Sequence, residues 1–232
     1  MIRQLLLGEL MAGSSQDSIL VIVAHPDDEC LGAGGTIRRH VDQGIGVDVL
    51  ALTGNDTRNK ELRAACRLLG VREVYTSIRD DFAIDWSLGK ETVQVILKSR
   101  PSAVITHSAD DYNRNHVQCA QMVADAIEWA SHSTTFENAH RVRRIYGMEI
   151  NSLHSHPHVL MDVSESFATA VSALKEHKSQ LTKADAFYLR FYDARTRLRG
   201  IQADCERAEA FTISLPTHAG PFYTVNAVKT LI

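Results

Sequence analysis

Short apolar runs rich in β-branched residues alternate along this chain with amphipathic segments of helical length. The first run, Ile19–Ala24, is continuously apolar, as expected of a strand buried on both faces of a sheet. The expected strands, each with the helix that follows it, are 19–24 with 36–43, 47–52 with 58–69, 73–76 with 90–99, and 103–106 with 116–130. Four strand–helix units in succession predict an α/β fold of the Rossmann-like kind, a mainly parallel sheet with helices on both faces.

The C-terminal third has a less regular pattern. Strands are expected at 144–150, 159–163 and 210–215, and helices at 164–178 and 184–206. No Pro/Ser-rich linker, charge block or internal repeat divides the chain. We therefore expect residues 1–232 to form one domain.

Composition excludes several classes of function. The hydrophobic share of 44% and the charged share of 23% are those of a globular protein. A net charge of −3 offers no basic excess for nucleic acid, and no apolar run reaches the roughly 18–20 residues of a membrane span. Glu9 interrupts the leucines near the N-terminus, which favours a capping segment over a signal peptide. The four cysteines form no C-x-x-C pair, so we expect a cytoplasmic protein; a homo-oligomer is left open.

Two polar clusters follow expected strands. His25–Glu29 comes directly after the first strand, and Thr106–His116 spans the end of the fourth and the start of its helix. Ligands of parallel α/β sheets bind at the carboxyl ends of the strands. These clusters are therefore the expected functional site.

The residue types in these clusters fit a catalytic metal site. His25 and Asp28 can face one point from a tight turn that Pro26 fixes, and His116 can supply a third ligand. Two histidines and one carboxylate leave a position for water, which is a catalytic zinc pattern. Asp27 is then free to act as a base. Solvated or helix-capping polar residues in strand-end loops are the alternative, and the spacing leaves both open.

The segment Val23–Thr36, which reads VAHPDDECLGAGGT, resembles the signature of the LmbE-like, or N-acetylglucosaminyl-phosphatidylinositol deacetylase-like, family. That family consists mainly of zinc-dependent enzymes that remove N-acyl groups from sugars. Weaker matches extend the resemblance, in order, over nearly the whole chain: Thr53-Gly54, 58–61, 69–71, Arg79-Asp80, Thr106-His107, 111–116, Lys175, Ser179-Gln180 and 208–211.

The resemblance implies a role for individual residues. His25, Asp28 and His116 match the metal ligands, and Asp27 matches the catalytic base. His107 is expected near the site but not as a ligand.

Two further positions match substrate-binding residues of the family. Arg58 matches an arginine that binds the sugar, its phosphate or its aglycone, and Asp80 matches a carboxylate that binds sugar hydroxyls. The alternatives are a solvated helix residue for Arg58 and a turn cap for Asp80, with Asp81 as a rival for the second role.

Two positions depart from the family's fullest pattern. Asn113 stands where many relatives have a histidine, and Asn115 stands where an aspartate is usual. We expect Asn113 to act in catalysis as a hydrogen-bond donor that cannot transfer a proton, with a structural turn residue as the alternative. Asn115 is expected beside the metal ligands, orienting one of them.

The expected function is a zinc-dependent hydrolase, or one using another divalent transition metal, that removes an N-acetyl group from an acetamido sugar. The substrate would be of the N-acetylglucosamine type, a nucleotide-linked sugar or a biosynthetic glycoside included. Two alternatives remain: a metal-dependent hydratase on the same scaffold, which the family contains, and a nucleotide-binding module without chemistry.

Overall fold

The computed structural model describes residues 17–79, 85–182 and 186–214, so the N-terminal segment and Asp80 lie outside the described part. Its centre is a seven-stranded sheet in the order β3-β2-β1-β4-β5-β7-β6. The strands are β1 (Ser18–Val23), β2 (Gly46–Ala51), β3 (Glu73–Thr76), β4 (Ala103–His107), β5 (Arg144–Met148), β6 (Val159–Asp162) and β7 (Ala208–Ser214). The first five strands pair in parallel, whereas β7 runs antiparallel to both β5 and β6. The predicted α/β, Rossmann-like class is confirmed.

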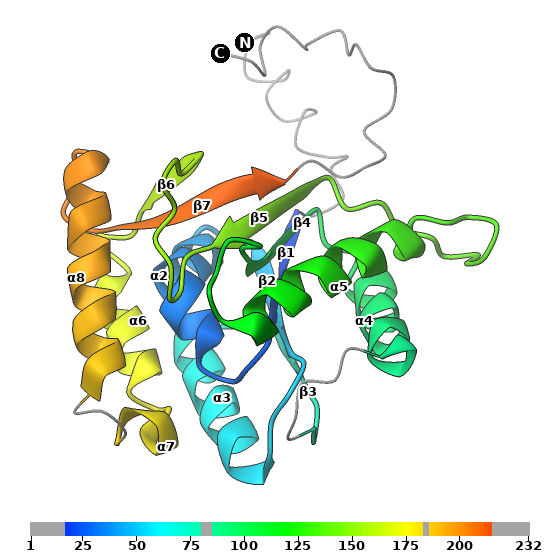
Figure 1. The fold of residues 1–232 in the computed structure, drawn as a ribbon, viewed down its shortest axis with the longest axis horizontal. Helices are drawn as coiled ribbons and strands as arrows, with labels where there is room; N and C mark the ends of the chain where they lie inside the picture. Colours follow the sequence, from blue (N-terminus) through cyan, green and yellow to red (C-terminus); the bar gives the residue numbers. More distant parts are fainter. Residues whose placement is uncertain (1–16, 80–84, 183–185, 215–232) are drawn as a thin grey trace, which may run out of the picture.

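Helices cover both faces of the sheet (Figure 1). They are α2 (Asp28–Asp42), α3 (Asp56–Leu69), α4 (Trp86–Ser99), α5 (Arg114–Ala130), α6 (Phe167–Leu174), α7 (Lys178–Leu181) and α8 (Phe187–Gln202). The paired helices α4 and α5 lie on one face, and α2, α3, α6 and α8 contribute to the core on the other. The expected helix at 164–178 is shorter in the structure, where α6 ends at Leu174 and α7 begins after a break.

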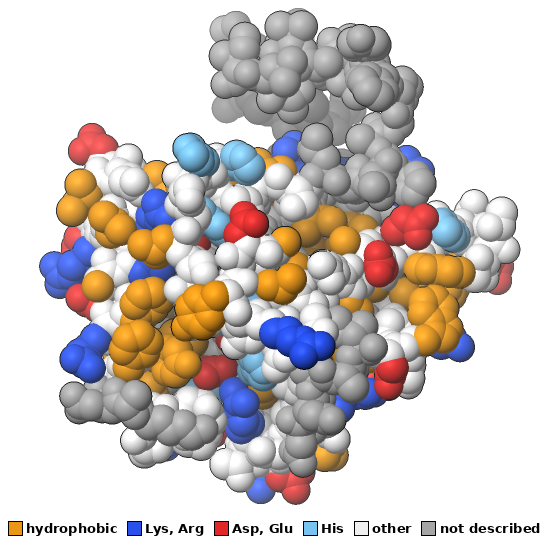
Figure 2. All heavy atoms as spheres, viewed as in Figure 1, with side chains coloured by type: hydrophobic (Ala, Val, Ile, Leu, Met, Phe, Trp, Pro, Cys, Tyr) orange, Lys and Arg blue, Asp and Glu red, His pale blue; other side chains and the backbone are white. Residues whose placement is uncertain are grey.

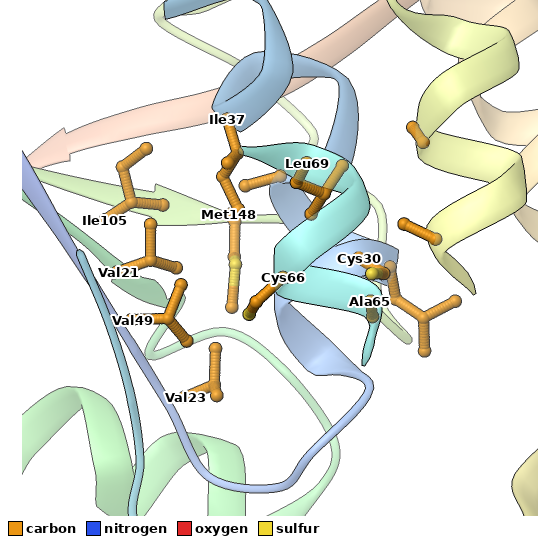
Figure 3. Close-up of a cluster of buried hydrophobic side chains, with 14 of the residues drawn as sticks. Val21, Val23, Cys30, Ile37, Val49, Ala65, Cys66, Leu69, Ile105 and Met148 are labelled. Carbon is orange, nitrogen blue, oxygen red and sulfur yellow. The ribbon is translucent and has the colours of Figure 1, made fainter. Parts of the chain in front are cut away.

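The strand residues divide alternately between two cores, because successive side chains of a strand point to opposite faces. Val21 and Val23 of β1 pack with α2 and α3, whereas Leu20 and Ile22 pack with α4 and α5. Figure 3 shows the first of these cores, with strand valines facing Cys66 and other side chains of the helices. All four cysteines are free, and three of them are buried.

The Gly32–Gly35 segment is helical, whereas the sequence predicts that the helix after β1 begins only at residue 36. Helix α2 begins already at Asp28 and is interrupted at Ala33, whose φ of −146° is not helical. A Cβ on Gly32 would lie 2.3 Å from the sulfur of Met148 on β5, and one on Gly35 would lie 2.6 Å from Cβ of Val163. The glycines therefore let the helix pack closely on its neighbours.

A buried carboxylate from β7 stabilises the interruption in α2. Both oxygens of Glu209 accept backbone N–H groups there, from Gly35 at 2.9 Å and from Thr36 at 2.8 Å. The Tyr192 hydroxyl of α8 also donates to Glu209 at 2.7 Å. N–H groups freed by a break in a helix are costly to bury without a partner, so Glu209 replaces the missing helical acceptors.

The surface around α8 is notably apolar. Figure 2 shows hydrophobic side chains gathered over this part of the molecule, and the exposed side chains of α8 include Phe187, Leu198 and Ile201. In the described part of the chain, no helix combines the length and apolarity that crossing a membrane requires.

Candidate active site

The two polar clusters meet at the point where the strand order reverses. β1 continues through α2 to β2 on one side, while its other neighbour is β4. The carboxyl ends of β1 and β4 are therefore adjacent, and such a switch point is where ligands bind in open α/β sheets. The structure places the turn after β1 and the predicted cluster Thr106–His116, at the end of β4, together, as the sequence predicted.

The turn after β1 brings His25 and Asp28 to one point. Asp28 is the first residue of α2, and its Oδ2 accepts the backbone N–H of His25 at 2.9 Å. The same oxygen lies 3.2 Å from Nδ1 of His25. The turn thus directs one imidazole nitrogen and one carboxylate at the same space.

His116 joins them from the first turn of α5. Its Nε2 lies 3.4 Å from Oδ1 of Asp28, and its Nδ1 lies 3.1 Å from Oδ2 of Asp111. Each of His25, Asp28 and His116 offers a ligand atom within 4.8 Å of the other two. With Nδ1–H donated to Asp111, the lone pair of Nε2 faces the other two ligand atoms, which is how carboxylates orient metal-binding histidines.

The electrostatics of this trio favour a cation. Burial opposes a charge on His116, but Asp28 and Asp111 outweigh it and raise the pKa of the imidazole to about 10. Burial likewise favours protonation of Asp28, yet His116 and His107 hold its pKa well below the ordinary value. The site therefore places a positive charge between two carboxylates. A divalent cation bound at Nε2 would replace that proton, so the donor set fits a metal.

His107, at the end of β4, lies beside the trio, with its Nε2 3.4 Å from Oδ2 of Asp28. That nitrogen accepts the backbone N–H of Ala24 at 2.9 Å, and the ring stacks on His116 with 4.0 Å between the centroids. Its position supports the expected role beside the site rather than as a ligand.

Asp27 lies next to the trio in an unusual backbone conformation. Its φ of 122° and ψ of −28° are rare for a residue with a side chain, and such outliers cost about 1–3 kcal/mol. Arg58, in the first turn of α3, donates to Oδ1 of Asp27 at 3.0 Å and also to the carbonyl oxygen of Pro26. Burial and the charge of Asp28 raise the pKa of Asp27 to about 7 despite Arg58.

These residues line a polar cavity of about 180 Å³. Its walls are His25, Asp27, Asp28, Leu31, Arg58, Asn113, His116, Ile150, Asn151, Gln180 and Tyr188. A wider hollow of about 620 Å³ shares Arg58 and Gln180 with it and extends over the start of α3. A ligand in the cavity would therefore have room to continue into the hollow.

The two asparagines occupy different places. Asn113 caps α5, with Oδ1 accepting the N–H of Asn115 at 2.9 Å, and it also lines the cavity. Nδ2 of Asn115 lies 3.1 Å from Nε2 of His25. Asn115 thus contacts His25, a member of the trio. If the side-chain amide of Asn115 is turned, its oxygen accepts the Nε2 proton of His25, and Nδ1 of His25 is left to bind a cation.

The sequence pattern did not indicate the role of several residues of this site. Asp111 lies in a segment that resembles the family, but its contact with His116 does not follow from that pattern, and it also accepts the N–H of Asn151 at 3.1 Å. Gln180 is indicated only as a match to the family, and Tyr188 of α8 carries no signal, because neither lies near the two clusters in sequence.

The Gly-rich segment of α2 does not form a nucleotide site. Its glycines are buried and face Met148, Ala170 and Val163. The first turn of the helix carries the acidic Asp28 and Glu29, which disfavour an anion at this N-terminus.

Comparisons with known proteins agree with this description. The family model PIG-L, described as GlcNAc-PI de-N-acetylase, matches residues 20–127, a range that contains both polar clusters. Over 189 residues the chain is 26% identical to the diacetylchitobiose deacetylase of Thermococcus kodakarensis, covering 70% of this chain and 69% of that protein.

Two solved structures share the fold. The conserved protein TT1542 from Thermus thermophilus aligns with a TM-score of 0.78 at 24% identity, covering 90% of this chain and 99% of that one. The 4-carboxy-2-hydroxymuconate hydratase GalB from Pseudomonas putida KT2440 aligns with a TM-score of 0.76 at 20% identity, covering 89% and 100%. At these identities the likeness concerns the fold alone. The family match over both clusters and the sequence relative agree with the motif, and the chain is similar to the PIG-L, or LmbE-like, family, whose GlcNAc-PI de-N-acetylase model matches residues 20–127.

Proposed function

We propose that this protein is a zinc-dependent hydrolase that removes the N-acetyl group from an acetamido sugar of the N-acetylglucosamine type. The observation that carries the proposal is the trio His25, Asp28 and His116, whose ligand atoms lie within 4.8 Å of one another beside the carboxylate of Asp27. Two imidazoles and one carboxylate would hold Zn²⁺ and leave a position open. When bound, the ion would polarise the amide carbonyl and make water more acidic.

The side chains around the trio supply the proton transfers. Asp27 would accept a proton from the water that attacks the carbonyl carbon, through Oδ2, because Arg58 holds Oδ1. It would then deliver that proton to the nitrogen as the carbon–nitrogen bond breaks, which yields acetate and the amino sugar. Asn113 would donate from Nδ2 to the carbonyl oxygen, since its Oδ1 caps α5.

What the relatives have in common supports the proposed substrate class. The GlcNAc-PI de-N-acetylases and the diacetylchitobiose deacetylase are named for different conjugates of N-acetylglucosamine. We place the acetamido sugar in the 180 Å³ cavity and the rest of the conjugate in the wider hollow, where Arg58 and Gln180 line both spaces. Asp80 remains a proposed ligand of sugar hydroxyls; it follows Arg79, whose carbonyl oxygen accepts the N–H of Gly54 at 2.9 Å.

The test is metal analysis of the purified protein followed by incubation with a panel of acetamido sugars. The panel would include N-acetylglucosamine, diacetylchitobiose, a nucleotide-linked sugar and a glycoside, with release of a primary amine and of acetate as paired readouts. We expect one metal ion per chain and activity that chelation removes.

Two controls separate this function from its alternatives. The first control tests hydration, which the fold shared with the hydratase leaves open, and its substrate is an unsaturated dicarboxylate. If this compound loses its ultraviolet absorbance and no acetamido sugar releases amine, the protein is a hydratase and not a hydrolase. Nucleotide binding that survives chelation, without turnover of any substrate, would identify a binding module instead.

A further inference from the structure

A second ionisable cluster lies directly behind the proposed base. The side chains of Glu29 and His177 are both 0% exposed, and Nε2 of His177 lies 2.8 Å from Oε1 of Glu29. Cys30 also donates to that oxygen, with 3.1 Å between the two atoms. The pair joins α2 to the segment just before α7, parts of the chain separated by 148 residues.

The other oxygen of Glu29 contacts the backbone of Asp27. Oε2 accepts the N–H of Asp27 at 2.9 Å, and this contact is local, spanning two residues. It acts on the one residue of the turn with a φ of 122°. If the Glu29 carboxylate is itself held in place, it can therefore keep the Asp27 peptide in a backbone conformation that this peptide would otherwise leave.

His177 is itself held from outside the cluster. Ser179, two residues on, donates its backbone N–H and its hydroxyl to the carboxylate of Glu61 on α3, at 2.8 and 2.6 Å. Within the described residues, Nδ1 of His177 is buried without a hydrogen-bond partner, so the ring makes its hydrogen bond with Glu29. Glu29, Cys30 and His177 also group three potential ligand atoms, but the oxygens of Glu29 are already engaged in hydrogen bonds.

We propose that His177 is a positioning residue: through Glu29 it holds the backbone of Asp27 in the conformation that aims the carboxylate at the reacting atoms. The proposal deepens the proposed function and rests on it for the role of Asp27. Neither His177 nor Glu29 lines the cavity, so both act on the reaction through Asp27, whose backbone N–H Glu29 accepts.

The experiment compares the full-length, metal-loaded wild type with three variants. His177→Leu removes the donor to Glu29, and His177→Gln keeps an N–H at a similar reach. Glu209→Gln is the matched control, because Glu209 is also a buried carboxylate that accepts backbone N–H groups of α2, at Gly35 and Thr36 rather than at Asp27. For each protein, kcat, KM, metal content and the melting temperature are measured, and crystal structures of the wild type and His177→Leu are determined.

We expect kcat of His177→Leu to fall by about 10- to 100-fold, the usual effect of losing a residue that orients an active-site group, with KM and metal content close to wild type. His177→Gln should recover most of that loss. Glu209→Gln should melt at a lower temperature and keep kcat. In the crystal structure of His177→Leu, Asp27 should have left the positive-φ conformation that the wild type shows.

Three results would overturn the proposal: equal kcat in His177→Leu and wild type, equal losses in the Leu and Gln variants, or an unchanged Asp27 backbone in His177→Leu. If the Leu variant does not fold, His177→Asn takes its place, because its shorter amide cannot reach Glu29. A wild type that releases amine from no acetamido sugar would refute the proposed function instead. The crystal structures would still decide whether His177 holds the Asp27 backbone, since that readout needs no turnover.

Discussion

Asp27 and Asp28 are adjacent in sequence, yet their surroundings give them opposite chemistry. Asp28 faces His116 and His107, which keep its pKa well below the ordinary value, so it is an anion suited to bind a cation. Asp27 is buried beside that anion, which raises its pKa to about 7. Neighbouring carboxyl groups whose environments separate their pKa values commonly divide the roles of ligand and base.

Asp27→Asn separates binding from chemistry. The amide oxygen can still accept from Arg58, and the trio of ligands is intact, so metal content and melting temperature should stay close to wild type. Turnover should fall by about 10²–10⁴, the usual contribution of a general base. Metal analysis and kcat, measured on the same preparation, check this. Near-normal turnover would place the base elsewhere.

Asn113 combines a cap with a proposed donor, and substitutions can divide the two. Asn113→Ala loses both, and removing the cap should cost about 0.5–2 kcal/mol of stability. Asn113→Ser keeps a capping oxygen but lacks the reach of Nδ2 into the cavity. We expect the Ser variant to retain most of its melting temperature and to lose about 10- to 10³-fold in turnover, the range for an oxyanion donor.

The pH profile adds a second readout for Asn113. Neither asparagine nor serine titrates at a useful pH, so the shape of the profile should be the same in the wild type and in Asn113→Ser. A shifted alkaline limb would contradict the assignment. Undiminished turnover in the Ser variant would make Asn113 a capping residue only.

At the scale of elements, glycine was the residue type that sequence reasoning placed least well. The helix after β1 is expected only from residue 36, because the glycines at 32–35 are poor helix formers, yet the close approach of Met148 and Val163 decides the structure. By contrast, α3 ends at the predicted residue 69, and Gly70 follows it with the positive φ of 80° that glycine adopts without strain. A local rule works at a helix end, but it fails where packing from a distant strand determines the conformation.

Two glycine substitutions test this interpretation. Gly35→Ala puts a methyl group 2.6 Å from Cβ of Val163, so α2 must shift, and we expect a loss of about 1–3 kcal/mol. Gly89→Ala, the matched control in α4, meets nothing closer than 3.7 Å and should gain roughly 0.5–1 kcal/mol from helix propensity. Chemical denaturation measures both. Equal effects of the two substitutions would show that packing does not explain Gly35.

The start of α4 provides a pH-dependent test. Asp85 accepts the N–H of Leu88 at 2.8 Å, and this hydrogen bond lowers the pKa of Asp85 below its ordinary 3.8. The folded state therefore favours the carboxylate form of Asp85. The cap stabilises the fold at pH values above the ordinary pKa of 3.8, and this stabilisation is lost as the pH falls through the lower pKa that Asp85 has in the folded state. Asp85→Ala should melt below wild type at pH 7, and the gap should narrow toward pH 3. A gap that stays constant would mean that charge plays no part in the cap.

For the molecule as a whole, the alternation of strands and helices predicted the parallel half of the sheet and the edge where the site lies. The antiparallel pairing of β7 with β5 and β6 was not predictable, because short apolar runs carry no direction. The site divides in the same way. Residue types at strand ends and the family motif together indicate His25, Asp28 and His116 as candidate ligands, whereas the supporting Asp111 and His177 depend on contacts that only the tertiary structure defines.

Metal binding should stabilise the whole fold, because the ligand trio joins the β1–α2 turn to α5. A ligand that binds only the folded state at 100 times its Kd adds about 2.7 kcal/mol. Zn²⁺ should therefore raise the melting temperature of chelator-treated protein, and the rise should saturate at one ion per chain. Chelation should leave the protein folded, with its far-ultraviolet circular dichroism unchanged, because His116 can keep a proton between Asp28 and Asp111 in place of the ion.

His116→Ala should abolish the zinc-dependent rise in melting temperature, whereas His107→Gln, which keeps an acceptor for the N–H of Ala24, should retain it. A rise that persists in His116→Ala would remove His116 from the ligands, and one that disappears in His107→Gln would add His107 to them.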